Sequence, residues 1–186
     1  MSDLTEERIS STRVFDGVLL KVYKDEVELP NGRRSVREYI KHPGAAVMVP
    51  VSENGNIIME RQYRYPVGDV MWELPAGKID EGEDPIESAK RELQEETGYE
   101  AARFTSLGKL HPGIGYSDEV IYLYLAEDLT FHEEAQDHDE FIETFELSLT
   151  GALDAIRTGK ITDAKSMVSL FWAEKSLKGE WKSGEV

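Results

Sequence analysis

Three glutamates near the middle of the chain have a spacing that suits a hard metal cation. Glu92, Glu95 and Glu96 are so close in sequence that on an α-helix they occupy about 100° of arc. Carboxylates held this closely repel one another and lose solvation unless a cation lies between them. Arg91 precedes Glu95 by one helical turn, so it can pair with Glu95 and hold it in place. The pattern predicts a cation site suited to a phosphate.

The surrounding sequence contains its own signals for a helix. Asp84 is a favourable N-cap residue, Pro85 suits the first helical position, and Glu87 follows as in a capping box. Gly98 is a favourable C-terminal stop. Three apolar residues have helical spacing and predict a buried stripe: Ile86, Ala89 and Leu93. An acidic helix face in plain solvent is the alternative, because most runs of charge are of that kind.

The stretch from Gly77 to Tyr99 resembles the Nudix box, G-x5-E-x7-R-E-U-x-E-E-x-G-U, in which U is a bulky aliphatic residue. Every other fixed position matches; the one departure is Tyr99, which is large and apolar but not aliphatic. The resemblance implies an α/β fold, the Nudix α/β/α sandwich with a mixed central sheet. It also implies a hydrolase of nucleoside diphosphates linked to another moiety, with two to three Mg²⁺ or Mn²⁺ ions per active site.

The same resemblance implies roles for individual residues of the stretch. The implied metal ligands are the carboxylates of Glu92, Glu95 and Glu96 and the backbone carbonyl of Ala76. Arg91 would orient Glu95, so that the catalytic residues would include Arg91, Glu95 and Glu96. Gly77 would allow the backbone to turn close to the site, and Glu83 would be a supporting carboxylate.

Two flanking segments resemble ADP-ribose pyrophosphatases and related nucleoside diphosphate sugar hydrolases. The first contains Gln-Tyr-Arg at 62–64 and Glu-Leu-Pro-Ala-Gly-Lys at 73–78. The second, His-Pro-Gly-Ile-Gly-Tyr-Ser-Asp-Glu at 111–119, resembles the proline-containing loop of that group. The substrate contacts predicted in these segments are Arg61, Arg64, Glu73, Ser117 and Glu119.

Each flanking residue also has a simpler interpretation. Arg64 contacts diphosphate oxygens or stacks on a base, or it is a surface arginine. Glu73 accepts a hydrogen bond from a base amino group, or it ends a strand in solvent. Ser117 and Glu119 reach the distal ribose and a water molecule at the metal, or they cap a turn. One aromatic residue is expected to stack on the base, although a core or interface position is the stronger alternative for each candidate. The candidates are Tyr63, Tyr65 and Trp72.

Hydrolysis also needs a base that takes a proton from the attacking water. In ADP-ribose hydrolases, which this chain resembles, the base often comes from an acidic loop outside the box. Residues 133–140 are acidic and precede the last expected strand. Glu140 fits the role best, and Asp139 and Glu143 are the alternatives. An acidic loop in solvent is the simpler interpretation.

Composition limits the class of partner. A net charge of −16 repels nucleic acid, and it also makes a metal bridge necessary for a diphosphate substrate. The absence of cysteine fits a reducing compartment. The polar N-terminus and the lack of an apolar run approaching 18 residues argue against a signal peptide or a membrane span. We therefore expect a cytoplasmic protein with no nucleic-acid or membrane partner.

Local patterns predict the elements that position these residues. In an N-terminal piece, residues 1–43, antiparallel strands are expected at 12–29 and 35–40, around a turn at Asn31-Gly32. A main domain, residues 44–186, has the following predicted elements: strands at 45–51, 56–61, 104–110, 120–125 and 141–149, and helices at 150–158 and 162–178. The N-terminal strands are too few to be stable alone. The resemblance implies that they form a homodimer and contribute to the partner's site.

These observations predict hydrolysis of the diphosphate bond of ADP-ribose to AMP and ribose 5-phosphate. GDP-mannose, or a broad range of nucleotide sugars, is the alternative substrate. Dinucleoside polyphosphates and mRNA caps are disfavoured because no basic patch is present. A sensor that binds nucleotide sugars without cleaving them is an alternative from another class, but such a protein would be expected to have lost carboxylates of the box.

Overall fold

The computed structural model describes residues 3–132 and 141–181. The chain divides into two compact units, which are described separately. The first comprises Met1–Pro43 and His111–Val120, and the second comprises Gly44–Leu110 and Ile121–Val186. No helix in the described parts of the chain is long and apolar enough to cross a membrane.

The first unit is a single antiparallel sheet with the strand order β1-β2-β3. Its strands are β1 (Glu7–Asp16), β2 (Lys21–Glu28) and β3 (Arg34–Lys41). Gly32 adopts a φ of +79° in the turn between β2 and β3, as the Asn-Gly pair predicts. The loop 111–120 belongs to this unit because the Ile40 N–H donates to the carbonyl of Tyr116, at 2.8 Å.

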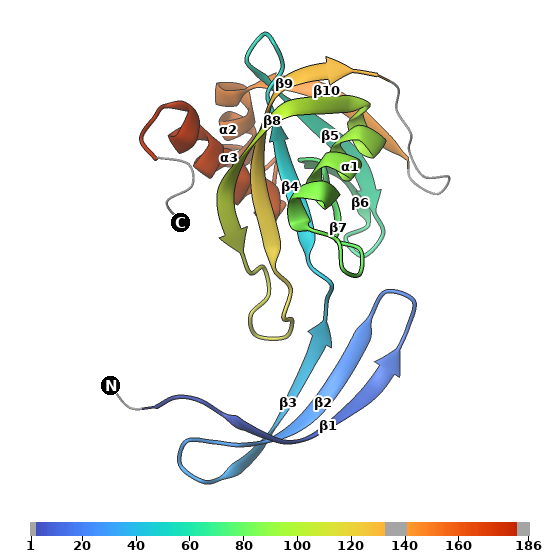
Figure 1. Ribbon diagram of the computed structural model, residues 1–186, viewed down its shortest axis with the longest axis vertical. Coiled ribbons are helices and arrows are strands. Elements are labelled where there is room, and N and C mark those ends of the chain that lie inside the picture. Colours follow the sequence, from blue (N-terminus) through green and yellow to red (C-terminus); the bar gives the residue numbers. More distant parts are fainter. Residues whose placement is uncertain (1–2, 133–140, 182–186) are drawn as a thin grey trace. The chain divides into compact units, whose positions relative to one another are not determined.

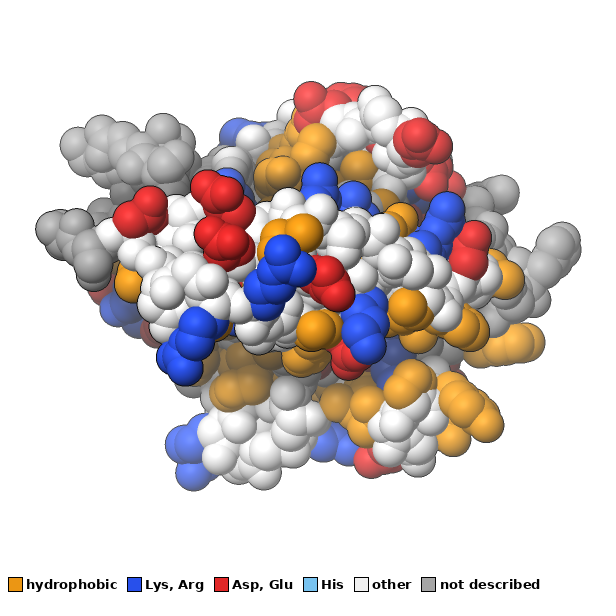
Figure 2. Space-filling model, turned by 90° about the horizontal axis from the view of Figure 1, so that it is seen from below, with side chains coloured by type: hydrophobic (Ala, Val, Ile, Leu, Met, Phe, Trp, Pro, Cys, Tyr) orange, Lys and Arg blue, Asp and Glu red, His pale blue; other side chains and the backbone are white. Residues whose placement is uncertain are grey.

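Many apolar side chains of the first unit are exposed. The exposed ones are Leu4, Ile9, Val14, Phe15, Val18, Leu19, Leu20, Val36, Ile114 and Tyr116. Figure 2 shows apolar side chains at the surface among charged ones. A single sheet layer has no second layer to cover its apolar side chains.

The second unit contains a mixed sheet and a smaller antiparallel sheet. The mixed sheet has the order β7-β4-β9-β8, in which β4 and β9 are parallel; the other sheet has the order β10-β5-β6. The strands are β4 (Ala45–Pro50), β5 (Asn56–Arg64), β6 (Asp69–Glu73), β7 (Ala76–Lys78), β8 (Tyr99–Leu110), β9 (Ile121–Phe131) and β10 (Ile142–Ser148).

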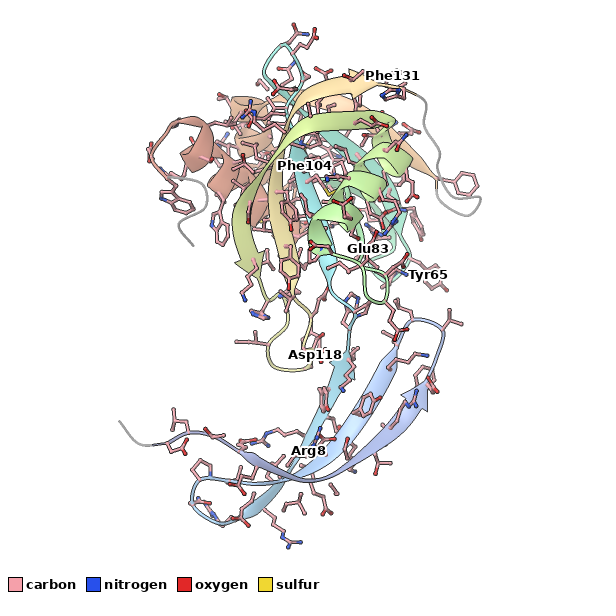
Figure 3. All side chains as sticks on the ribbon, in the orientation of Figure 1. Arg8, Tyr65, Glu83, Phe104, Asp118 and Phe131 are labelled. Atoms are coloured by element: carbon pink, nitrogen blue, oxygen red, sulfur yellow. The ribbon has the colours of Figure 1, made fainter. Side chains whose placement is uncertain are left out.

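Helices cover both sides of the mixed sheet (Figure 1). Ala46 and Met48 of β4 belong to the cluster under α1 (Pro85–Thr97), which Phe104 of β8 also contacts (Figure 3). Val47 and Val49 belong to the other cluster, with α2 (Leu149–Arg157) and α3 (Ala164–Leu177). Because both faces of β4 are covered, the strand is apolar throughout instead of alternating. The predicted mixed α/β sandwich is confirmed.

Helix α1 begins and ends where its sequence predicts. The Asp84 side chain accepts a hydrogen bond from the Ile86 N–H, and Gly98 adopts a left-handed conformation after the last turn. Glu87 does not complete a capping box; its carboxylate pairs with Lys90, at 2.7 Å. Since Lys90 lies one turn further along the helix, its ammonium competes for the same carboxylate.

Candidate active site

Arg91 connects the acidic residues of α1 to the loop before the helix. Its Nη1 donates to Oε1 of Glu92, at 2.7 Å, and to Oε2 of Glu95, at 2.9 Å. Its Nη2 donates to Oε2 of Glu83, at 3.1 Å, and to the carbonyl of Lys78, at 3.2 Å. Hydrogen bonds to Glu83 and Glu92 raise the pKa of Arg91, and the Arg91 guanidinium lowers the pKa of Glu83 to about 2. Arg91 is therefore the centre of an acidic cluster that joins helix and loop.

Strand β7 places Gly77 directly against the Glu92 carboxylate. A β-carbon added to Gly77 would lie 1.8 Å from Cδ of Glu92 and within 2.2 Å of both its carboxylate oxygens. No other residue type leaves this space, so the side chain of Glu92 depends on the glycine for its position. The glycine predicted to permit close approach does so in the structure.

Glu96 joins α1 to the backbone just before Gly77. Its side chain is buried, with the residue 4% exposed, and its Oε2 accepts a hydrogen bond from the Ala76 N–H, at 2.9 Å. Ala76 is itself fixed by its pairing with Val47 of β4. The helix, the start of β7 and the central sheet therefore form one support for the three glutamates.

The donor set of this cluster fits a hard divalent cation. Glu92, Glu95 and Glu96 offer carboxylate oxygens, which Mg²⁺ and Mn²⁺ prefer. In the part of the chain that the structure describes, however, no group of three or more His, Cys, Asp or Glu side chains is arranged so that it could hold a metal ion as it stands. Arg91 instead lies between Glu92 and Glu95. A cation at these carboxylates would take over part of the charge compensation that Arg91 supplies.

A second ionic cluster lies where β5 and β6 meet the start of α3. Arg64 donates from Nε and Nη2 to the two carboxylate oxygens of Glu73, at 2.7 and 3.0 Å. Lys165 donates to Oε2 of Glu73 and to Asp163, the latter at 3.0 Å. Burial opposes ionisation of Glu73, whose side chain is only 3% exposed, but Arg64 and Lys165 together hold its pKa below the ordinary value. Glu73 is therefore an ionised anchor for Arg64.

The charge of Arg64 interacts with carboxylates of both clusters. Burial disfavours its charge, but the hydrogen bond to Glu73 and the negative charges of Glu73, Glu60 and Glu96 raise its pKa overall. Glu60 is fully buried on β5 and is the cross-strand partner of Glu73. No motif in the sequence predicts a role for Glu60 or Lys165. The sequence does contain one signal for Glu60, because this acidic residue directly follows the apolar residues 57–59 of a strand.

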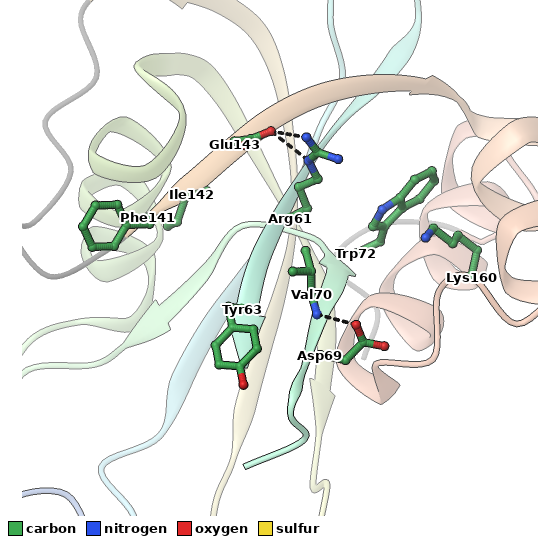
Figure 4. Close-up of a pocket in the computed structure, with 9 residues that line it drawn as sticks. All are labelled: Arg61, Tyr63, Asp69, Val70, Trp72, Phe141, Ile142, Glu143 and Lys160. Carbon is green, nitrogen blue, oxygen red and sulfur yellow. Dashed lines mark hydrogen bonds and ion pairs between the residues drawn. The ribbon is translucent and has the colours of Figure 1, made fainter. Parts of the chain in front are cut away.

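Arg61 lies on the opposite face of the sheet from Arg64. Its cross-strand partners are Trp72 and Glu143, and its Nε donates to Oε2 of Glu143, at 2.8 Å. Both side chains line an open cavity of about 590 Å³ with Tyr63 (Figure 4). Successive strand residues point to opposite faces. The structure therefore does not bring Arg61, a predicted substrate contact, or Glu143, an alternative base, together with Arg64 and the glutamates.

The other predicted residues have the following positions. Ser117 and Glu119 belong to the first unit, where Oγ of Ser117 accepts from the Glu119 N–H, at 3.1 Å. This contact is of the turn-capping kind that was the alternative for Ser117, and a substrate role for both residues stays a prediction. Trp72 packs on Phe145, with ring centroids 4.7 Å apart, as the core alternative predicts. Glu140 and Asp139 lie outside the described residues.

Comparison with known families agrees with this site. Residues 41–169 match the NUDIX domain family, and residues 6–40 match the family described as the nucleoside diphosphate sugar hydrolase N-terminal domain. The chain therefore belongs to the Nudix hydrolase family. Members of this family generally depend on divalent metal ions.

Individual relatives cover nearly the whole chain. It is 40% identical over 172 residues to the ADP-ribose pyrophosphatase of Bacillus subtilis strain 168, which covers 91% of this chain and 93% of the relative. It is 41% identical over 173 residues to the methanol dehydrogenase activator of Bacillus methanolicus, which covers 91% and 94%. A crystal structure of an ADP compounds hydrolase has a TM-score of 0.86 with 26% identity, and the match covers 100% of both chains.

Proposed function

We propose that this chain hydrolyses the diphosphate bond of ADP-ribose to AMP and ribose 5-phosphate, with Mg²⁺ or Mn²⁺ as cofactor. The observation that carries the proposal is the acidic cluster on α1, in which Arg91 holds Glu92 and Glu95; the charge of Glu96 in this cluster also contributes to the raised pKa of Arg64. A cationic group beside a carboxylate cluster suits a substrate diphosphate bridged to metal ions. The name of the Bacillus subtilis relative supports ADP-ribose as the substrate.

The acidic cluster provides the metal-binding half of the site. Glu92, Glu95 and Glu96 would hold two to three ions, together with the carbonyl of Ala76. Bound there, the cation would supply positive charge to the diphosphate oxygens and lower the pKa of water. Arg91 keeps Glu92 and Glu95 in position through one shared nitrogen.

Arg64 provides the substrate-binding half of the site. The carboxylate of Glu73 accepts hydrogen bonds from Nε and Nη2 of Arg64. The third nitrogen, Nη1, is then available to donate to a diphosphate oxygen. In the reaction, water adds to one phosphorus, the anhydride P–O bond breaks, and the bridging oxygen leaves on the other phosphate. A positively charged donor stabilises the negative charge that shifts onto these oxygens.

We propose Glu140 as the base that accepts the proton of the attacking water, and Asp139 as the next candidate. Glu140→Gln should then lower kcat about 100-fold or more, with KM little changed. An unchanged rate would transfer the role to Asp139.

We also propose that the chain is a cytoplasmic homodimer whose N-terminal sheets contact a second copy. The support is the number of exposed apolar side chains on β1 and the β1–β2 loop, among them Val14, Phe15 and Val18. Apolar patches of this kind mark interaction sites. Analytical ultracentrifugation should give twice the chain mass, and a monomer at micromolar concentration would remove this part of the proposal.

Product analysis tests the catalytic proposal. The purified protein with Mg²⁺ should be incubated separately with ADP-ribose, GDP-mannose, ADP-glucose and a dinucleoside polyphosphate. AMP and ribose 5-phosphate formed well ahead of the other products would support ADP-ribose as substrate. Similar cleavage of several sugars would indicate a general nucleotide-sugar hydrolase. The absence of cleavage with every compound would contradict hydrolysis and favour the sensor alternative.

A further inference from the structure

Lys165, in the first turn of α3, has an ammonium group held almost out of solvent. Its side chain is 14% exposed, and Nζ donates to the carboxylates of Glu73 and Asp163. Burial opposes the charge of Lys165, but these carboxylates raise its pKa. A buried ammonium is costly unless it is paired in this way, so the lysine is bound tightly to two acidic groups.

The contacts of Lys165 extend to Arg64 through a row of alternating charges. Arg64 pairs with Glu73, Glu73 pairs with Lys165, and Lys165 pairs with Asp163. Oε2 of Glu73 accepts from both Arg64 and Lys165. Because the ammonium holds the same carboxylate oxygen that accepts from Arg64, it fixes the carboxylate that orients the guanidinium.

The same turn of α3 fixes the backbone next to Glu73. Asp163 caps the helix by accepting from the Ser166 N–H, at 3.0 Å, and Oγ of Ser166 accepts from the Leu74 N–H, at 2.8 Å. Two contacts therefore fix Glu73. Its side chain pairs with Lys165, and the N–H of the next residue, Leu74, donates to Ser166. An open cavity of about 540 Å³ is lined by Arg64, Glu73 and Lys165.

We propose that Lys165 is a positioning residue that acts through Glu73 to keep Arg64 in the orientation that binds the substrate diphosphate. This inference rests on the proposed function, in which Arg64 contacts that diphosphate. Lys165 is not placed in contact with substrate, and its effect should therefore require Arg64.

Steady-state kinetics with ADP-ribose and Mg²⁺ test the inference on the full chain. Lys165→Met, which retains the unbranched apolar stem of the side chain without the ammonium group, should raise KM about tenfold and change kcat less than about twofold. Lys165→Arg, which restores a cation, should return KM to within about threefold of the native value. Lys178→Met is the matched control, because Lys178 follows the same helix and pairs with Glu174 at the surface; its KM should be native.

A double-mutant cycle separates positioning from a general structural role. In an Arg64→Ala background, Lys165→Met should cause no further increase in KM, since the group it positions is absent. An equal increase in both backgrounds would overturn the inference. If Lys165→Met does not fold, as judged by circular dichroism, Lys165→Gln replaces it in the cycle.

Failure of the inference and failure of the proposed function give different results. Suppose that the native protein hydrolyses ADP-ribose and that Arg64→Ala and Lys165→Met both have the native KM. The proposed function then stands, and the positioning role of Lys165 is overturned. A native protein that hydrolyses none of the nucleotide sugars removes the function itself, and the positioning role with it.

Discussion

The two arginines at the candidate site are held in opposite ways. Arg91 divides its donors among several acceptors, including Glu83, Glu92 and Glu95. Arg64 directs two nitrogens at the single carboxylate of Glu73. The carboxylates differ as well: the Glu95 side chain is 40% exposed, and that of Glu73 is 3% exposed.

This difference suits two different tasks. A guanidinium that shares its donors among partly exposed carboxylates can lose one partner at little cost, because water replaces the contact. The acidic cluster therefore has the freedom to rearrange that the proposed binding of cations requires. A two-point pair with a buried carboxylate is strongly oriented, and breaking it leaves a buried charge. Arg64 therefore has the fixed orientation that its proposed contact with the diphosphate requires.

Glu96 belongs to the acidic cluster around Arg91, and its charge also acts on Arg64. Glu96→Gln should therefore have the largest effect on activity. The glutamine oxygen can still accept from the Ala76 N–H, so the fold and Tm should be retained. The loss of one ligand charge should lower kcat about 100-fold or more. Glu100→Gln is the control, since Glu100 is an exposed carboxylate of β8. Full activity of Glu96→Gln in Mg²⁺ would contradict the metal role of Glu96.

Gly77→Ala tests whether the acidic cluster depends on close approach of the backbone. The added methyl group would overlap the Glu92 carboxylate, so it should force Glu92 away from Arg91. Overpacking of this kind costs about 1–3 kcal/mol, and we expect a lower Tm together with a kcat reduced about tenfold. The control is Gly151→Ala in α2, where alanine suits the helix and the added carbon would lie 3.1 Å from Oγ of Ser148, a tight contact that a shift of a few tenths of an ångström relieves. Native kinetics of Gly77→Ala would show that Glu92 has room to move.

The acidic cluster could be predicted from the sequence because it is local. The cap at Asp84, the stop at Gly98 and the spacing of Arg91 from Glu95 all lie in one helix and its ends. Helical geometry converts such spacing directly into proximity. The position of Gly77 against Glu92 came from the family resemblance, since the two residues are brought together by β7 and α1.

The second cluster could not be predicted in the same way because it depends on tertiary contacts. Lys165 is 92 positions from Glu73 in the sequence, and nothing local indicates that they pair. The motif that contains Arg61 and Arg64 also does not reveal which side of the sheet each faces. Strand alternation separates them, and only the pairing of β5 with β6 and β10 shows which face is near the glutamates.

Glu83→Gln tests how firmly Arg91 is held, through the pH dependence of Tm. Its expected effect is the smallest of the three. Hydrogen bonds from Arg91 and the Asp80 backbone lower the pKa of Glu83 from 4.5 to about 2 in the folded chain. A lowered pKa means that the carboxylate stabilises the fold above pH 4.5 and that this contribution is lost as pH falls toward 2. Glu83→Gln should therefore lower Tm slightly at neutral pH, and its difference from the native protein should shrink below pH 4.5. Glu87→Gln, which removes the surface pair with Lys90 and leaves the contacts of Arg91 intact, is the control. A Tm difference that does not change with pH would mean that Arg91 does not depend on the charge of Glu83, and that its remaining acceptors suffice to hold the cluster.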